Sequence, residues 1–154
     1  MTSAAASSSS VGDDADARLF VAVCAGDVAA AQAAAAGGAS VRAQIHDGSE
    51  PLHVACSHGH LDVAQWLHSA GASLNATDGD GDTPLHLACA EGHLDVAQWL
   101  HRAGASEDAT NNGGDTPLHS ACSEGHLGIA QWLHSGGASL DATNIEGRTP
   151  LHLT

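Results

Sequence analysis

Histidine and cysteine recur at fixed intervals along this 154-residue sequence, and both side chains bind metals and take part in catalysis. The densest group is Cys56, His58 and His60, which places three potential ligands close together in the chain. A structural zinc site needs four ligands, usually as two spaced pairs, and the residue 33 positions after His58 is Glu91. We therefore expect no metal site and no cofactor.

The motifs of common catalytic centres are missing from the sequence. It contains no lysine, no His-Glu-x-x-His, no Gly-x-Ser-x-Gly and no glycine loop that ends in a lysine. The serines, histidines and aspartates are spread evenly along the chain, which assembles no triad. We predict that the protein is not an enzyme and has no catalytic residues.

The charge of the chain is strongly acidic, with a formal net charge of -14 at pH 7. A basic surface is the first requirement for binding a phosphate backbone, so we expect no binding to nucleic acid or to an anionic membrane. No apolar run approaches the ~20 residues that span a bilayer. A protein segment of opposite charge is the more reasonable partner.

The cysteines and the N-terminal residues indicate the cellular compartment. Cys56, Cys89 and Cys122 are 33 residues apart. If each interval forms one layer of a stack, the Cα atoms of these cysteines lie on the order of 10 Å apart, which is too far for a disulfide. We expect these three and Cys24 to be reduced, buried thiols. Residues 1–11 are rich in serine and alanine and lack a secretory pattern, which predicts a disordered tail. An intracellular, cytoplasmic protein is expected.

A period of 33 residues organises the chain, because proline, glycine and tryptophan each recur at this interval. Residues 51–77 and 84–110 match at 21 of 27 positions without a gap. The recurring residues are Pro51, Pro84, Pro117 and Pro150; Gly48, Gly81, Gly114 and Gly147; and Trp66, Trp99 and Trp132.

Each period predicts two short helices and a turn. Thr83 is a good N-cap, and Pro84 suits the first helical position because no N–H is needed there. The first helix is expected to end at Gly92, and a second helix follows over 94–102 with its apolar residues on one face. Helices this short are unstable alone, so each pair must pack on the next to form an elongated stack.

The strings DGDGDTPLHLACAEGHLDVAQWLHRAGAS over 78–106 and GGDTPLHSACSEGHLGIAQWLHSGGAS over 113–139 resemble ankyrin repeats, through their Thr-Pro-Leu-His and Gly-His-Leu motifs. The resemblance implies an all-α ankyrin-repeat solenoid with hairpin-like connecting turns. The domain is expected over 12–154, divided into an atypical unit at 12–44, three full units at 45–77, 78–110 and 111–143, and a partial unit at 144–154.

Some units depart from the pattern. The first lacks Thr-Pro, and its second helix is mostly alanine, which predicts a weak cap. Glu107 replaces the apolar Leu74 and Leu140. The sequence stops shortly after Pro150, so two alternatives stay open: a targeting or regulatory fragment of a larger enzyme or channel, and end-to-end self-association through an uncapped last unit. The oligomeric state is not predicted.

Structural roles are expected for the histidines and tryptophans. In ankyrin-like proteins the histidine of Thr-Pro-Leu-His ties neighbouring loops together, and its ring nitrogen is expected to contact the N-cap threonine of its own unit. His60, His93 and His126 are expected to cap the second helices. The tryptophans are expected to pack in the core.

The resemblance implies a non-catalytic protein–protein interaction module. In ankyrin-like proteins the turn tips and the ends of the first helices line a concave groove, and exposed positions that differ between near-identical units are its expected contact residues. The tips contribute His46, Asp47, Ser49, Asp80, Asp82, Asn112, Asp115, Ile145, Glu146 and Arg148, and the helix ends contribute Ser57, His58, Ala90, Glu91, Ser123 and Glu124. Carboxylates predominate, which favours a basic protein segment as the partner.

Overall fold

The computed structural model describes the backbone of residues 2–153 and the side chains of residues 14–152. Within this part the chain forms eight α-helices and one short 3₁₀ helix, with no strand, and no helix is long and apolar enough to cross a membrane. The elements are α1 (Thr2–Ala25), α2 (Val28–Ala36), α3 (Pro51–His58), α4 (Leu61–Ser69), α5 (Pro84–Glu91), α6 (Leu94–Ala103), α7 (Pro117–Ser123), α8 (Leu127–Ser135) and η1 (Pro150–Leu153).

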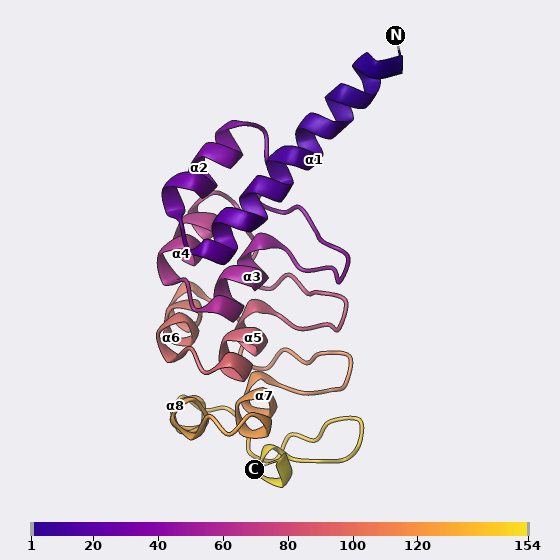
Figure 1. Cartoon of the computed structure of the whole chain (residues 1–154). Coiled ribbons are helices and arrows are strands. Elements are labelled where there is room, and N and C mark those ends of the chain that lie inside the picture. The colour runs from indigo at the N-terminus through magenta and orange to yellow at the C-terminus, as the bar shows by residue number, and fades with distance from the viewer. Residues whose placement is uncertain (1, 154) are drawn as a thin grey trace.

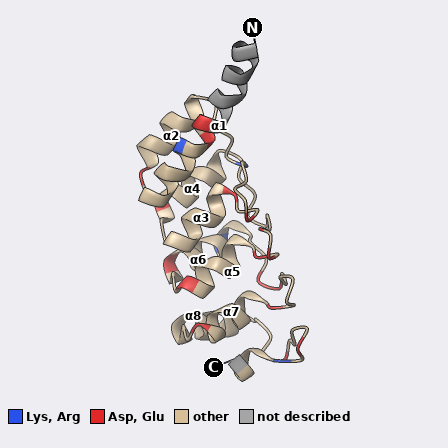
Figure 2. Cartoon of the chain, turned by 45° about the vertical axis from the view of Figure 1, so that its right-hand side comes forward, with Lys and Arg blue, Asp and Glu red and all other residues tan. Residues whose placement is uncertain are grey.

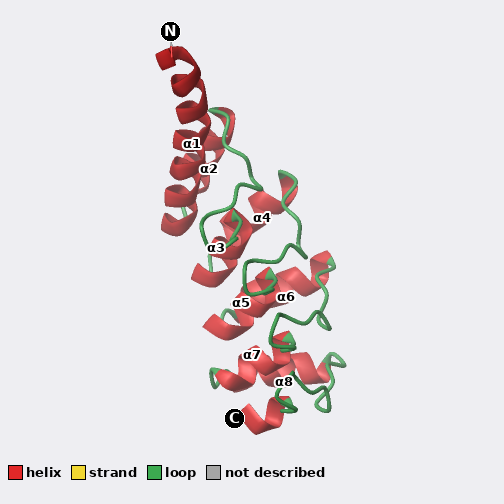
Figure 3. Cartoon of the chain, turned by 90° about the vertical axis from the view of Figure 1, so that its right-hand side faces the viewer, coloured by secondary structure: helices red, strands yellow, loops and turns green. Residues whose placement is uncertain are grey.

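The helices form consecutive antiparallel pairs stacked along one axis (Figure 1). The first helices α1, α3, α5 and α7 contact one another in sequence, and η1 continues this row after α7. The second helices α2, α4, α6 and α8 form a parallel row beside them. Long turns connect the pairs and project to one side as hairpin-shaped loops, which face the viewer in Figure 3. The expected all-α solenoid is confirmed.

The first helices begin and end where the sequence predicts. Pro84 is the first residue of α5, and the hydroxyl of Thr83 accepts a hydrogen bond from the His86 backbone N–H. Gly92 ends α5 in the left-handed conformation that lets its N–H bond the carbonyl of Ala88. The equivalent prolines, Pro51 and Pro117, are the first residues of α3 and α7.

The core is a continuous column of leucine, valine, alanine and cysteine that runs between the two rows of helices. Leu85 of α5 and Val96 and Leu100 of α6 are fully buried. Their counterparts in neighbouring pairs occupy the same places, so each pair covers the apolar face of the one before it. The tryptophans pack partly buried against this column, as predicted, and the rings of Trp99 and His68 meet in a T-shaped contact.

The first pair departs from the others. Its first helix, α1, is longer, and Arg18 stands where Pro51 starts α3. The carboxylate of Asp16 accepts a hydrogen bond from the Ser40 backbone N–H at 2.8 Å, which holds the turn after α2 against α1. α1 includes part of the predicted disordered tail over 1–11, but the side chains of residues 1–13 lie outside the described part, and the tail remains a prediction.

Two expectations about individual side chains are wrong. His60, His93 and His126 occupy N-cap positions but make no side-chain capping bond. The Nε2 of each instead reaches a carbonyl at the end of the first helix of the preceding unit. For His93 this partner is the Ser57 carbonyl of α3, at 3.0 Å. Cys24 is exposed, whereas the other three cysteines are buried; all four are unpaired thiols.

The departure at Glu107 is balanced by a new contact. Its carboxylate lies 2.7 Å from Nδ1 of His101, at the end of α6. The neighbouring units cannot form this pair, because they have Leu74 and Leu140 at the position of Glu107. A largely buried carboxylate is thereby given a hydrogen-bonding partner.

Candidate partner-binding groove

Four turns project from the stack, and we call their residues 45–49, 78–82, 111–115 and 144–148 the first to fourth tips. Each tip is closed by a bond between its ends, such as Asp78 N–H to the Asp82 carbonyl at 3.0 Å. Neighbouring tips are joined by one backbone bond each: Gly79 donates to Asp47 at 2.7 Å, Asn112 to Asp80 at 2.9 Å, and Ile145 to Gly113 at 2.9 Å. The tips therefore form one continuous wall.

Buried histidines hold this wall against the first helices. In His86, Nδ1 accepts a hydrogen bond from the Thr83 backbone N–H at 3.1 Å and lies 2.9 Å from the Thr83 hydroxyl, as predicted. Nε2 donates to the Asp115 carbonyl of the next tip at 2.8 Å. His53 and His119 make the equivalent contacts with the carbonyls of Asp82 and Arg148. Each histidine thus connects one unit to the next.

Glu50 is an exception at the N-cap of α3, where the later units have threonine. The residue is only 4% exposed. Its Oε1 lies 3.8 Å from Nε of the largely exposed Arg42, and its Oε2 has no hydrogen-bond partner among the described residues. A buried carboxylate oxygen without a partner is destabilising.

A Glu50→Thr variant is therefore expected to be more stable than the parent by about 1 kcal/mol, because it removes the buried carboxylate and supplies the N-cap hydroxyl. Urea denaturation followed by tryptophan fluorescence measures this difference. The reciprocal variant Thr83→Glu should be destabilised. A loss of stability in Glu50→Thr would contradict the prediction.

A hollow of about 340 Å³ lies between the first two tips and the first helices, and we call it the acidic hollow. It brings six of the predicted contact residues together: Asp47, Ser49, Ser57, His58, Asp80 and Asp82. Its other lining residues are Ile45, His53, Val54, Asp78 and Leu87. Residues of two tips and of the end of α3 therefore lie together in this hollow, and their role in partner binding stays a prediction.

Three carboxylates of the second tip converge in this hollow: single oxygens of Asp78, Asp80 and Asp82 lie within 4.8 Å of one another. Asp78 accepts hydrogen bonds from the backbone of Asp80 and Asp82, and Asp82 accepts one from the Asn111 amide at 2.8 Å. Burial raises the pKa of Asp82, the Asn111 bond opposes this, and repulsion from Asp78 and Asp80 raises it further. The tip therefore has a concentrated negative charge that a cationic group would stabilise.

A metal ion is not required to explain this arrangement. Oxygen ligands suit Ca²⁺ or Mg²⁺, but these ions take at least six ligands, and two of the three carboxylates already accept protein hydrogen bonds. The chemical capacity of the second tip is that of a general cation-binding surface.

Of the remaining predicted residues, His46 belongs to the first tip and the others lie further along the same row; none of them lines this hollow. Asp115 is half-buried and accepts a hydrogen bond from the Asn144 amide at 2.9 Å, and Arg148 pairs with Glu146 of its own tip at 3.2 Å. Ser49 is buried, so the expectation that it is exposed is wrong. His46, Glu91, Asn112, Ser123, Glu124 and Ile145 are exposed, and Ala90 is partly exposed.

A second hollow of about 520 Å³ adjoins the first and shares Ile45 and Asp47 with it. We call it the apolar hollow, because Ala17 and Phe20 of α1 face Ile45 of the first tip across it. It is completed by Asp16, Gln44 and His46. Apart from His46 and Asp47, the sequence did not predict these contact residues, although Ile45 differs in type from Asp78, Asn111 and Asn144 at the same position.

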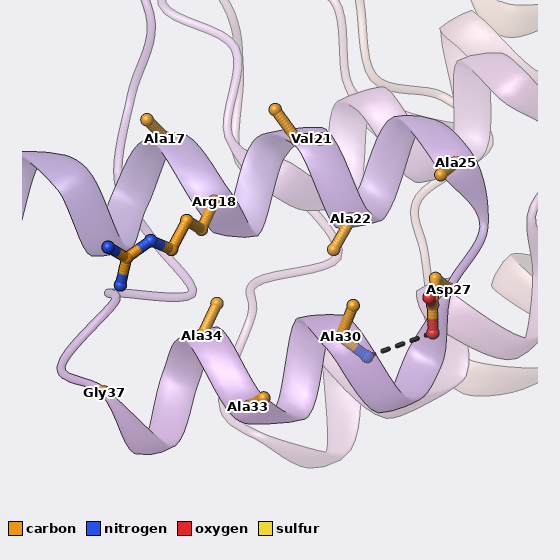
Figure 4. Close-up of a pocket in the computed structure, with 10 residues that line it drawn as sticks. All are labelled: Ala17, Arg18, Val21, Ala22, Ala25, Asp27, Ala30, Ala33, Ala34 and Gly37. Carbon is orange, nitrogen blue, oxygen red and sulfur yellow. Dashed lines mark hydrogen bonds between the residues drawn. The ribbon is translucent and has the colours of Figure 1, made fainter.

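A third hollow, of about 590 Å³, lies between α1 and α2 at the end of the stack (Figure 4). Its walls are mostly alanine, with Arg18 near one end and Asp27 at the other. Asp27 is already engaged as the N-cap of α2, accepting from the Ala30 N–H at 3.0 Å. None of the predicted contact residues lines this hollow.

The groove offers little for catalysis. Both ring nitrogens of His53, His86 and His119 are engaged by the backbone, which leaves none of these rings as a free base. Burial raises the pKa of Cys56 and Cys89, which disfavours the nucleophilic thiolate. The geometry is that of a helical-repeat protein whose tips and first helices enclose an acidic hollow.

Comparison with family models places the chain. The model of ankyrin repeats in many copies matches residues 19–68, 52–101 and 89–134. The protein belongs to the ankyrin-repeat family, whose members are generally protein–protein interaction modules and typically non-catalytic. A comparison with curated proteins found no match.

Proposed function

We propose that this protein is a non-catalytic interaction module that binds a basic segment of a partner protein in the groove between the tips and the first helices. The observation that carries the proposal is the number of carboxylates on the projecting tips (Figure 2), four of which, Asp47, Asp78, Asp80 and Asp82, line the acidic hollow. Asp80, Glu91 and Glu124 are exposed, so their charges are available to a partner. Opposite charge gives such contacts their specificity and speed of association.

The test is fluorescence anisotropy with a labelled peptide of alternating arginine and glycine. Binding is expected at low salt and should weaken as salt rises. The variant Asp80→Lys, Glu91→Lys, Glu124→Lys should bind at least about tenfold more weakly, since it replaces attraction by repulsion. Asp82 and Asp115 are left unchanged because they accept structural hydrogen bonds from asparagines.

A matched control separates groove binding from the general attraction of an acidic protein for a cationic peptide. Asp62, Asp95 and Asp108 are exposed on or after the second helices, outside the groove. Reversing these three charges changes the net charge equally but should leave binding nearly intact. Equal loss in both variants, or binding that is insensitive to salt, would contradict the proposed function.

A further inference from the structure

The negative charge is distributed unequally among the tips. The first tip carries Asp47, the second carries three aspartates, the third carries Asp115, and in the fourth Glu146 is paired with Arg148. The groove is therefore most acidic at the second tip. This is also where the acidic hollow lies, so the highest charge density coincides with an indentation of the surface.

The surroundings make these carboxylates stronger cation binders than isolated surface acids. Asp78 and Asp82 are half-buried, and Val54 and Leu87 form apolar parts of the hollow. Charges that are partly withdrawn from water attract a counter-charge more strongly and are screened less by salt. Glu91 and Glu124 are exposed and stand apart from such a cluster, so each is expected to contribute little alone.

The size of the acidic hollow limits what it holds. Its volume of about 340 Å³ lies at the lower end of small-ligand sites, which measure about 300–1,000 Å³. An entering cation reaches Asp80, for which the structure gives no side-chain hydrogen bond, and the remaining acceptor positions of Asp78 and Asp82. These features suit the single charged head and apolar stem of a basic side chain.

The adjoining apolar hollow extends this surface towards α1. Ile45 is 43% exposed and lies between the two hollows, and Phe20 is partly buried on the far side. Both Ile45 and Phe20 are particular to this end of the stack. The later units have Asp78, Asn111 or Asn144 at the position of Ile45, and His53, His86 or His119 at the position of Phe20. These two residues line the apolar hollow, so an apolar hollow lies beside the acidic one at this end of the stack.

We propose that the two hollows together bind one short segment of a partner protein, which places a basic side chain in the acidic hollow and an apolar side chain in the apolar hollow. This inference rests on the proposed function and names the part of the groove and the chemistry of the segment. The shared residues Ile45 and Asp47 make the two sites contiguous, so one segment reaches both.

The probes are blocked peptides that carry one leucine and one arginine with a variable number of glycines between them, titrated into the isotopically labelled full chain and followed by NMR. Backbone amide signals of the first and second tips and of α1 around Phe20 should shift. A peptide with glutamate in place of arginine, or glycine in place of leucine, should bind about tenfold more weakly.

Two sets of variants test the assignment. Asp47→Asn, Asp78→Asn, Asp80→Asn removes three charges from the acidic hollow while keeping every side-chain oxygen that accepts a backbone bond. The matched control Glu91→Gln, Asp115→Asn, Glu124→Gln removes three charges elsewhere in the groove. Ile45→Asn replaces the isoleucine that lines the apolar hollow by asparagine, the residue found at the equivalent positions 111 and 144. Circular dichroism melting verifies folding.

The first set should lose about tenfold in affinity and the control less than about twofold, while Ile45→Asn should abolish the preference for leucine over glycine. If the control variant loses as much affinity as the first set, or if the shifts lie at the third and fourth tips, the inference is overturned and the proposed function stands. If the arginine–glycine peptide also fails to bind, the proposed function fails as well.

Discussion

A His86→Ala variant is expected to lose about 3–5 kcal/mol of unfolding free energy, the largest effect that we predict for a polar residue. His86 is 1% exposed and bonds to Thr83 of its own unit and Asp115 of the next tip. Its removal leaves a buried N–H and a carbonyl without partners and opens a cavity. Urea denaturation followed by tryptophan fluorescence measures the loss.

The matched control is His134→Ala, because His134 is exposed on α8. This change should alter stability by no more than about 0.5 kcal/mol. If both variants are equally stable, His86 does not act as the structural tie between units described above.

The pH dependence of the unfolding free energy provides a second test of the role of His86. Burial lowers the pKa of His86 below its ordinary 6.5, outweighing the Asp115 bond and the nearby carboxylates of Asp82 and Asp78, which raise it. The unfolded chain therefore binds this proton first, so the contribution of His86 to stability is complete above pH 6.5 and is lost as pH falls towards the lowered value. The difference in unfolding free energy between the parent and the His86→Ala variant should therefore become smaller as the pH falls through this range.

Gly81→Ala is expected to destabilise the protein by about 3 kcal/mol. Gly81 has a φ of +79°, which L-residues rarely adopt, and an added Cβ would lie 2.8 Å from the Asn112 backbone nitrogen. That nitrogen donates to the Asp80 carbonyl, so the clash disturbs the bond that joins the second and third tips. The same urea measurement applies.

Gly147 provides the control for backbone strain alone. It occupies the same place in the fourth tip with a φ of +74°, and a Cβ there would meet nothing within 4 Å. Gly147→Ala should therefore cost only the conformational term, about 1 kcal/mol. Equal losses at the two positions would show that contact between tips contributes nothing to stability.

Most of the helical framework follows from the sequence, since its causes are local. Thr83, Pro84 and Gly92 determine where α5 begins and ends through capping and backbone geometry, which depend on neighbouring residues. The spacing of Val96 and Leu100 defines the buried face of α6. The period of 33 residues then repeats these local choices, and the family and fold follow with them.

Tertiary structure decided which side chains meet between units. The bond from His93 to Ser57 joins residues 36 positions apart, whereas the sequence predicted a local cap. Ser49 is buried although its variable turn position suggested exposure. Ile45 and Phe20 line one hollow only because the first tip lies beside α1.

The sequence by itself therefore determined the solenoid, the class of protein and the acidic character of its tips, since periodicity, capping and composition are properties of short segments. It also marked tip and helix-end positions as contact candidates through their variation between units. Only the stacking brought Asp47, Asp78 and Asp80 to one hollow beside an apolar one. Local patterns specify which face of a helix is buried, but the partner of each exposed side chain depends on how successive units are placed in space.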